Sequence, residues 1–239
     1  MTCYVHPKAF SSRVAMLSQI QPGGAVAEIG VFDGGFSEEL LRLTSPRLLL
    51  LIDLWADEMI FSGDADGNNV RQFHGRVLES QVRKRFDSNG IVDVRRGTSA
   101  ILRDFPDSYF DAIYVDAAHE YEPVRRDLIA AYRALRPGGW LMGHDYGVNP
   151  ERTDSRWEFG VRPAVDDFCR DFREEISCFG MDGCTSFGIK VRKDGAELDH
   201  YAGRLRSARS GLVNALTNAP LSLRKHLASA AARLSNQRH

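Results

Sequence analysis

Short apolar runs alternate along the chain with longer stretches in which apolar residues recur at helical spacing. The apolar runs have the length of strands and lie at residues 25–29, 48–54, 91–95, 110–115, 140–143, 176–179 and 187–191. The helical patterns lie between them, at residues 13–20, 37–43, 70–86, 123–135 and 164–172. Alternating strands and helices favour a parallel sheet with helices on both faces. The pattern therefore predicts an α/β fold with a doubly wound, mostly parallel, seven-stranded sheet.

Several predicted helices carry residues suited to helix ends. Ser37 suits the N-cap of the helix at 37–43, because its hydroxyl can accept a hydrogen bond from a free backbone amide. Pro123 suits the first position of the helix at 123–135, and Pro-Gly-Gly at 137–139 suits its end. One polar segment, residues 56–69, fits neither pattern. Long polar loops in compact domains are usually functional, so we expect this segment to be a lid over a substrate.

A glycine turn and an acidic residue follow the first two predicted strands. Gly30, Gly34 and Gly35 come directly after the strand at 25–29, where glycines allow backbone amides to approach a ligand closely. Asp53 ends the next strand, where a carboxylate can accept hydrogen bonds from ribose hydroxyls. Ligands of open α/β sheets bind at the carboxyl ends of the strands. This pair therefore predicts an adenosine-containing cofactor.

The residues inside the turn separate two classes of cofactor. A dinucleotide-binding turn has the spacing G-x-G-x-x-G, and here Phe32 stands where the middle glycine would approach a pyrophosphate. Glu28 and Asp33 add negative charge, which disfavours a pyrophosphate and suits a cationic ligand. An NAD-dependent oxidoreductase is therefore disfavoured. The alternative without function is that residues 26–35 form only a tight strand-to-helix turn.

Acids and histidines follow the fourth and fifth predicted strands. Asp116 ends the strand at 110–115, and His144 and Asp145 end the strand at 140–143. Two carboxylates and an imidazole that converge there can hold a divalent ion, which lowers the pKa of a bound hydroxyl. Histidine favours Mn²⁺, Zn²⁺ or Fe²⁺ over Mg²⁺. The alternative is that Asp116 caps the following loop and His144 bonds Asp145 or a carbonyl.

Four motifs in this order resemble the class I S-adenosylmethionine-dependent methyltransferases. They are E-x-G-x-x-x-G-G at 28–35, LLLLIDLW at 48–55, FDAIYVDAAHEY at 110–121 and LRPGGWLMGHDY at 135–146. The similarity covers roughly residues 25–192. It is closest to the branch with macrocin-type and mycinamicin-type sugar O-methyltransferases, with catechol O-methyltransferases more distant. The resemblance implies a Rossmann-like methyltransferase fold and S-adenosylmethionine as the cofactor.

The resemblance also implies roles for individual residues. It places Glu28, Gly30 and Gly34 at the methionine end of the cofactor, Asp53 at the ribose and Ser99 near the adenine. The full set of expected cofactor-binding residues is Glu28, Gly30, Val31, Gly34, Asp53, Leu54, Ser99 and Asp116. In the metal-dependent sugar enzymes, the positions of Asp116, His144 and Asp145 are the metal ligands. Most of those enzymes carry two acids where this chain has His144 and Asp145.

His119 occupies the position of the general base in the resembling sugar enzymes. Imidazole has an ordinary pKa of about 6.5, which suits the removal of a hydroxyl proton at cellular pH. With Asp116 beside it, we expect His119 to catalyse O-methylation of a hydroxyl on a sugar, glycan or glycosylated natural product, assisted by Mg²⁺ or Mn²⁺. Two alternatives stay open: a metal-independent small-molecule methyltransferase, and a cofactor-binding module that docks to a partner.

Charge is distributed unevenly along the chain. The formal net charge is −1, but residues 199–239 carry a net charge of +6 and the other residues −7. We expect a methyltransferase domain at 1–198 and a basic tail of two amphipathic helices at 199–239. Such a tail suits packing within a homo-oligomer, or docking to a membrane surface or an acidic protein partner. Nothing in the sequence indicates nucleic-acid binding.

The cysteines and the longest apolar runs bear on the compartment. Four cysteines show no C-x-x-C spacing and no disulfide framework, so we expect them to be reduced. The longest apolar run has the length of a strand, which is far too short to cross a membrane. The first residues, MTCYVHPKAF, contain no apolar leader. These observations predict a cytoplasmic protein without a transmembrane segment.

Overall fold

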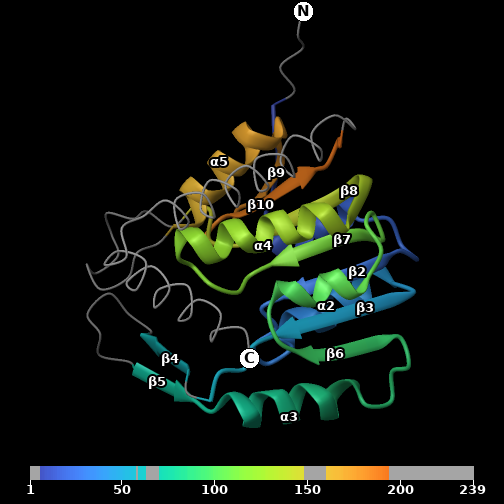
Figure 1. Cartoon of the computed structure of the whole chain (residues 1–239), viewed down its shortest axis with the longest axis vertical. Coiled ribbons are helices and arrows are strands. Elements are labelled where there is room, and N and C mark those ends of the chain that lie inside the picture. Colours follow the sequence, from blue (N-terminus) through green and yellow to red (C-terminus); the bar gives the residue numbers. More distant parts are fainter. Residues whose placement is uncertain (1–5, 58, 63–69, 148–159, 194–239) are drawn as a thin grey trace, which may run out of the picture. The chain divides into compact units, whose positions relative to one another are not determined.

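The computed structural model describes residues 6–57, 59–62, 70–147 and 160–193 (Figure 1). All of them belong to one unit of the chain, Met1–Lys193. The basic tail predicted at residues 199–239, and the domain boundary predicted before it, lie outside the described residues. Residues 58 and 63–69 of the predicted lid also lie outside them. Among the described residues, no helix has the length and apolar character needed to span a membrane.

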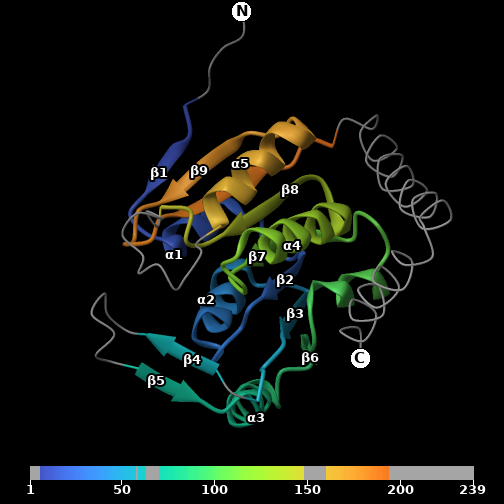
Figure 2. The same cartoon turned by 60° about the vertical axis from the view of Figure 1, so that its left-hand side comes forward.

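An eight-stranded sheet forms the centre of this unit, in the order β1-β9-β10-β8-β7-β2-β3-β6 (Figure 2). Its strands are β1 (Lys8–Phe10), β2 (Ala25–Ile29), β3 (Leu48–Asp53), β6 (Val92–Arg96), β7 (Phe110–Val115), β8 (Leu135–Gly143), β9 (Ile176–Gly180) and β10 (Ser186–Lys190). Only β10 runs antiparallel to its neighbours. The predicted α/β sheet is therefore confirmed, but it has eight strands instead of seven.

The additional strand, β1, pairs with β9 at one edge of the sheet. Its three residues are exposed or half-buried. A short edge strand that buries little apolar surface has no apolar run to reveal it. The central strands differ in this respect, because residues 49–52 of β3 are fully buried and all apolar. This burial is typical of a parallel strand that has helices on both of its faces.

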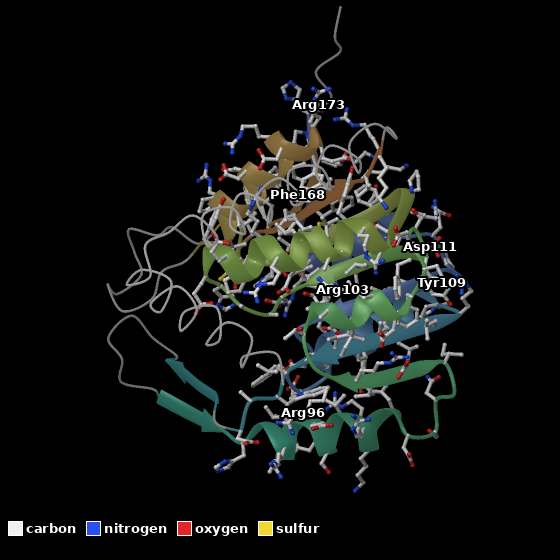
Figure 3. The ribbon with its side chains drawn as sticks, viewed as in Figure 1. Arg96, Arg103, Tyr109, Asp111, Phe168 and Arg173 are labelled. Carbon is white, nitrogen blue, oxygen red and sulfur yellow. The ribbon has the colours of Figure 1, made fainter. Side chains whose placement is uncertain are left out.

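Helices cover the sheet on both faces (Figures 1 and 2). They are α1 (Arg13–Met16), α2 (Gly35–Thr44), α3 (Gly75–Phe86), α4 (Tyr121–Ala134) and α5 (Val161–Phe172), with 3₁₀ turns η1 (Leu17–Gln19) and η2 (Ser99–Asp104). Residues of α1, α2 and α3 share one apolar core with alternate residues of the strands. On α5, the ring of Phe168 (Figure 3) packs against that of Tyr132 on α4, with the two centroids 5.5 Å apart.

A two-stranded hairpin replaces part of the predicted loop and helix. Strands β4 (Met59–Ser62) and β5 (Val70–Phe73) pair antiparallel, so the helix predicted at 70–86 begins only at Gly75. A Cβ atom on Gly75 would lie 2.1 Å from the carbonyl oxygen of Ala56. The chain therefore passes too closely here for any other residue. The residues between the two short strands are polar, so the sequence pattern predicts a loop at 56–69 and assigns residues 70–73 to the following helix.

Three residues or segments predicted to mark helix ends do not do so. Helix α2 begins at Gly35 with Gly34 as its N-cap, and Ser37 is instead buried, where its hydroxyl donates a hydrogen bond to Glu28. Helix α4 begins at Tyr121, before the predicted proline. Strand β8 begins directly after α4 at Leu135, so the Pro-Gly-Gly segment lies inside this strand. The helix ends themselves lie within two residues of the predicted ones, a difference that is common between assignments of helix boundaries.

Candidate active site

A cavity of about 840 Å³ lies at the carboxyl ends of the central strands. Its wall includes residues at or just after the ends of β2, β3, β6, β7 and β8. Strand β2 pairs with β3 on one side and with β7 on the other, so the order of strands along the chain reverses at β2. Such a reversal is the usual ligand site of an open α/β sheet. The volume suits a ligand of the size of a nucleoside derivative.

Gly30 is the point of closest approach in the glycine turn. Its φ is +92°, and a Cβ atom there would lie 1.9 Å from the carbonyl oxygen of Asp116. The end of β2 therefore lies directly against the end of β7. Phe32 also has a positive φ, +53°. A bulky residue at positive φ is uncommon and needs support from its surroundings.

That support comes from Asp53 at the end of β3. One oxygen of its carboxylate, Oδ2, accepts hydrogen bonds from the amides of Val31 and Phe32, each at 2.8 Å. The other, Oδ1, accepts one from the amide of Trp55 at 2.7 Å. The indole nitrogen of Trp55 donates in turn to the carbonyl of Phe32 at 2.9 Å. Asp53 thus holds the turn in place, a role that the sequence analysis did not predict. Oδ1, with a single donor, retains accepting capacity for a ligand.

The segment after β3 is fixed by a residue from the end of the neighbouring strand. Arg96, at the end of β6, donates to the carbonyl of Leu54 at 3.1 Å and to that of Trp55 at 2.9 Å (Figure 3). Leu54 lines the cavity with its side chain 56% exposed. A solvent-exposed leucine held against a cavity by its own backbone offers an apolar face to a flat ligand.

Most of the predicted cofactor-binding residues lie in the wall of this cavity. They are Glu28, Gly30, Val31, Asp53, Leu54, Ser99 and Asp116. Gly34 does not line it. At the N-cap of α2, a Cβ atom on Gly34 would instead face the side chains of Phe86 and Val82, each at 3.3 Å. Gly34 therefore serves the packing of α2 against α3, and its place at the methionine end of the cofactor stays a prediction.

Glu28 is a buried acid in the cavity wall, with 1% of its surface exposed. Burial raises its pKa to about 8, and the negative charges of Asp116 and Asp53 add to this effect. The hydrogen bond from Ser37 and the charge of Arg13 oppose it. Asp116 and Asp53 line the cavity together with Glu28, so this region is acidic. It therefore suits a cationic ligand, whose charge would favour the ionised form of Glu28.

Asp116, His144 and Asp145 come together beside this region, as the sequence predicts. One potential ligand atom from each lies within 4.8 Å of the others. The Nδ1 atom of His144 lies 3.0 Å from Oδ1 of Asp145 and 3.9 Å from Oδ1 of Asp116. Two carboxylates and an imidazole this close fit a divalent ion. The same 3.0 Å separation also fits a direct hydrogen bond between His144 and Asp145, so both sequence-based alternatives remain.

His119 joins this group from the loop after β7. Its Nε2 atom lies 3.0 Å from Oδ2 of Asp145, and its carbonyl accepts a hydrogen bond from the amide of Gly160 at 2.7 Å. Burial alone lowers the pKa of His119. The hydrogen bond to Asp145 and the charges of Asp145 and Asp116 outweigh burial and raise this pKa above its ordinary value. An imidazole held against a carboxylate in this way is a stronger base.

Arg13 is a site residue that the sequence analysis missed. Its guanidinium donates to Oδ2 of Asp116 at 3.0 Å and lies 4.7 Å from the ring centre of Phe36. Arg13 thus occupies one carboxylate oxygen of Asp116, while the other faces His144. The two residues are 103 positions apart. Only the packing of α1 beside the end of β7 brings them together, so no local signal indicates the pair.

Comparisons with known proteins are consistent with this geometry. A family model described as a methyltransferase domain matches residues 27–146. An uncharacterized protein of Acanthamoeba polyphaga mimivirus is 27% identical over 150 residues, which cover 61% of this chain and 59% of that protein. A sterol 24-C-methyltransferase of Yarrowia lipolytica is 27% identical over 183 residues, or 73% of this chain and 42% of that one. The chain thus spans about half the length of these curated relatives.

Among solved structures, an O-methyltransferase family protein from Burkholderia thailandensis has a similar fold. Its TM-score is 0.51 at 15% identity, over 76% of this chain and 55% of that one. At this level of identity the likeness concerns the fold alone. The matched family region contains the glycine turn, Asp53 and the whole Asp116–Asp145 part of the cavity wall.

Proposed function

The chain belongs to the methyltransferase domain family, and on this premise we propose that it is an S-adenosylmethionine-dependent O-methyltransferase. Its acceptor is a hydroxyl of a sugar, glycan or glycosylated natural product. The observation that carries the proposal is the single cavity whose wall contains both an acidic cofactor region and a histidine–carboxylate pair. A cofactor-binding module has no need for such a pair.

The residues of the cavity fit the cofactor. S-adenosylmethionine supplies a methyl group on a positively charged sulfur. The acids Glu28 and Asp116 provide negative charge for a cation, and Gly30 lets the backbone approach closely. Asp53, which already holds the glycine turn, can accept hydrogen bonds from ribose hydroxyls. We therefore assign the methionine end of the cofactor to the ends of β2 and β7.

His119 acts as the general base in this proposal. A hydroxyl is a poor nucleophile until its proton leaves, and an imidazole is well suited to take that proton. Asp145 orients the imidazole of His119 and stabilises its charged form once the proton has been accepted. The rest of the acceleration comes from positioning, because the cavity holds both reactants in one place. The presence of this histidine–carboxylate pair in turn supports an acceptor that must lose a proton, such as a hydroxyl.

A divalent ion would be held by Asp116, His144 and Asp145. It would lower the pKa of the acceptor hydroxyl and so make the work of His119 easier. Burial raises the pKa of Asp116, an effect that a bound cation would offset. The second candidate is a metal-independent O-methyltransferase. It is favoured by the 3.0 Å separation of His144 and Asp145, which fits a hydrogen bond without any ion.

Two measurements on the purified chain test the proposal. Calorimetric titration should show binding of S-adenosylhomocysteine and no binding of NAD. Transfer of an isotope-labelled methyl group from S-adenosylmethionine to a panel of sugars, glycosides and amines should label the hydroxyl compounds alone. Binding without transfer to any acceptor would favour the cofactor-binding module. Absence of S-adenosylhomocysteine binding would overturn the proposal.

A further inference from the structure

Asp127 is a buried acid in the cavity wall that has no part in the proposed methyl transfer. It belongs to helix α4 and is 8% exposed. Ser99 donates a hydrogen bond from its hydroxyl to Oδ1 of Asp127 at 2.5 Å. Both residues line the cavity, together with Arg126. The pair joins helix α4 to the turn η2 that follows β6.

One oxygen of the Asp127 carboxylate receives no hydrogen bond within the described part of the chain. Oδ1 accepts from Ser99, whereas the described residues donate no hydrogen bond to Oδ2. A buried carboxylate with an unused oxygen is costly unless a ligand or water supplies a donor. Burial also raises the pKa of Asp127, against the effects of Ser99 and Arg126. Because Asp127 lines the cavity, a ligand or water there can supply the missing donor.

Asp127 lies at the end of the cavity that is distant from His119. His119 and Asp145 follow β7 and β8, whereas Ser99 follows β6, and the strand order is β8-β7-β2-β3-β6. The reacting end and the Ser99–Asp127 pair thus lie at opposite ends of this row of strands. A ligand with its sulfur beside His119 and its ribose at Asp53 therefore places its base beside Asp127.

We propose that Asp127 recognises the adenine ring, with Oδ2 accepting a hydrogen bond from the exocyclic N6 amino group. This inference rests on the proposed function, because it takes an adenosine cofactor as the ligand. Adenine presents an amino donor at this edge, where hypoxanthine presents a carbonyl acceptor. A carboxylate oxygen attracts the first and repels the second. Asp127 thereby makes the cavity specific for adenine among purines.

The test compares S-adenosylhomocysteine with its deamino analogue by calorimetric titration. This analogue carries hypoxanthine in place of adenine, so a carbonyl group replaces the N6 amino group. A hydrogen bond to a carboxylate accounts for roughly a tenfold or larger change in affinity. We expect the wild type to bind the analogue about tenfold more weakly. In Asp127→Ala this difference should fall below about twofold. Ser99→Ala keeps the carboxylate and should keep most of the tenfold difference.

Asp127→Asn provides a second variant of nearly the same shape. Its amide can present either an oxygen or an NH₂ group to the ligand. We therefore expect Asp127→Asn to retain S-adenosylhomocysteine and to bind the hypoxanthine analogue at least about tenfold better than the wild type does. A structural role for Asp127 would not change the ratio of the two affinities.

Three outcomes decide between the proposals. The inference is wrong if Asp127→Ala still shows the full tenfold loss on removal of the amino group. It is also wrong if the wild type binds S-adenosylhomocysteine and its deamino analogue equally well. If the wild type binds neither compound, the proposed function itself fails. The first two results would leave the methyltransferase assignment intact.

Discussion

The Nε2 atom of His119 lies 3.0 Å from Oδ2 of Asp145, and the other oxygen of this carboxylate faces His144 at the same distance. Burial alone would raise the pKa of Asp145. The hydrogen bonds and charges of the two histidines outweigh burial and hold it well below its ordinary value. Asp145 therefore stays ionised in the physiological range, where it can orient His119 and serve a metal with its other oxygen.

Replacement of His119 by alanine is expected to abolish most turnover. Loss of a general base typically costs about 10²-fold to 10⁴-fold in rate. Binding of S-adenosylhomocysteine should change by less than about twofold, because the acidic cofactor region remains. Steady-state kinetics and calorimetry measure the two effects. His74→Ala is the matched control, because His74 is exposed and lies outside the cavity wall. Full activity in His119→Ala would exclude it as the base.

Removal of metal is expected to stop turnover if the three ligands hold a required ion. Excess EDTA should abolish methyl transfer, and added Mn²⁺ should restore it, since a histidine ligand favours Mn²⁺ over Mg²⁺. A second readout does not depend on activity. Calorimetric titration with Mn²⁺ should show one site in the wild type and at least about tenfold weaker binding in Asp116→Asn. Undiminished turnover in EDTA would favour the metal-independent candidate.

The fold was largely predictable because each central strand is an apolar run with helical patterns on either side. In β3, four consecutive apolar residues, all buried, are typical of a strand covered on both faces. The errors lie where this rule does not apply. Strand β1 is short and partly exposed, and the hairpin of β4 and β5 consists of two runs of four residues each. Short segments of this kind depend on contacts made elsewhere in the fold.

The candidate site was predictable wherever its residues end a strand. Carboxyl ends of parallel strands meet at one edge, so Asp116, His144 and Asp145 had to lie close together once the strands were identified. Arg13 and Asp127 could not be found in this way, since both lie on helices. Their positions depend on how those helices pack on the sheet. Sequence spacing carries no information about such contacts.

Replacement of Glu28 by glutamine is expected to change the pH dependence of stability. The pKa of Glu28 is about 8 in the folded protein and about 4.3 in an unfolded chain. Between these values the folded state holds a proton that the unfolded state has lost. The free energy of unfolding therefore falls as the pH rises through this window, by on the order of 1 kcal/mol per pH unit. Glutamine matches the protonated form and removes this contribution.

Urea unfolding of the wild type and Glu28→Gln at pH 5.5, 6.5 and 7.5 measures the difference. The groups that face Glu28 are Ser37, Asp116, Asp53 and Arg13, and the variant keeps all of them. Other titrating groups affect both proteins equally, so the difference in slope isolates Glu28. We expect the variant to gain stability relative to the wild type as the pH rises. Equal slopes in both proteins would show that Glu28 is already ionised at low pH.

Alanine substitutions at Gly30 and Gly23 separate the energetic cost of a close contact from the cost of a strained backbone. Both have a positive φ, +92° and +84°. A Cβ atom on Gly30 would lie 1.9 Å from the carbonyl oxygen of Asp116, whereas one on Gly23 would have no atom within 4 Å. Gly23→Ala should therefore cost only the strain of the left-handed backbone, about 1–2 kcal/mol.

Gly30→Ala should cost roughly 3 kcal/mol or more, because overpacking adds to the same strain. The alanine forces the ends of β2 and β7 apart, which displaces Asp116 from Arg13 and His144 together. We therefore expect Gly30→Ala to lose S-adenosylhomocysteine binding by more than about tenfold, while Gly23→Ala binds as the wild type does. Urea unfolding and calorimetry measure the two effects. Unchanged binding in Gly30→Ala would mean that the cofactor does not depend on this contact.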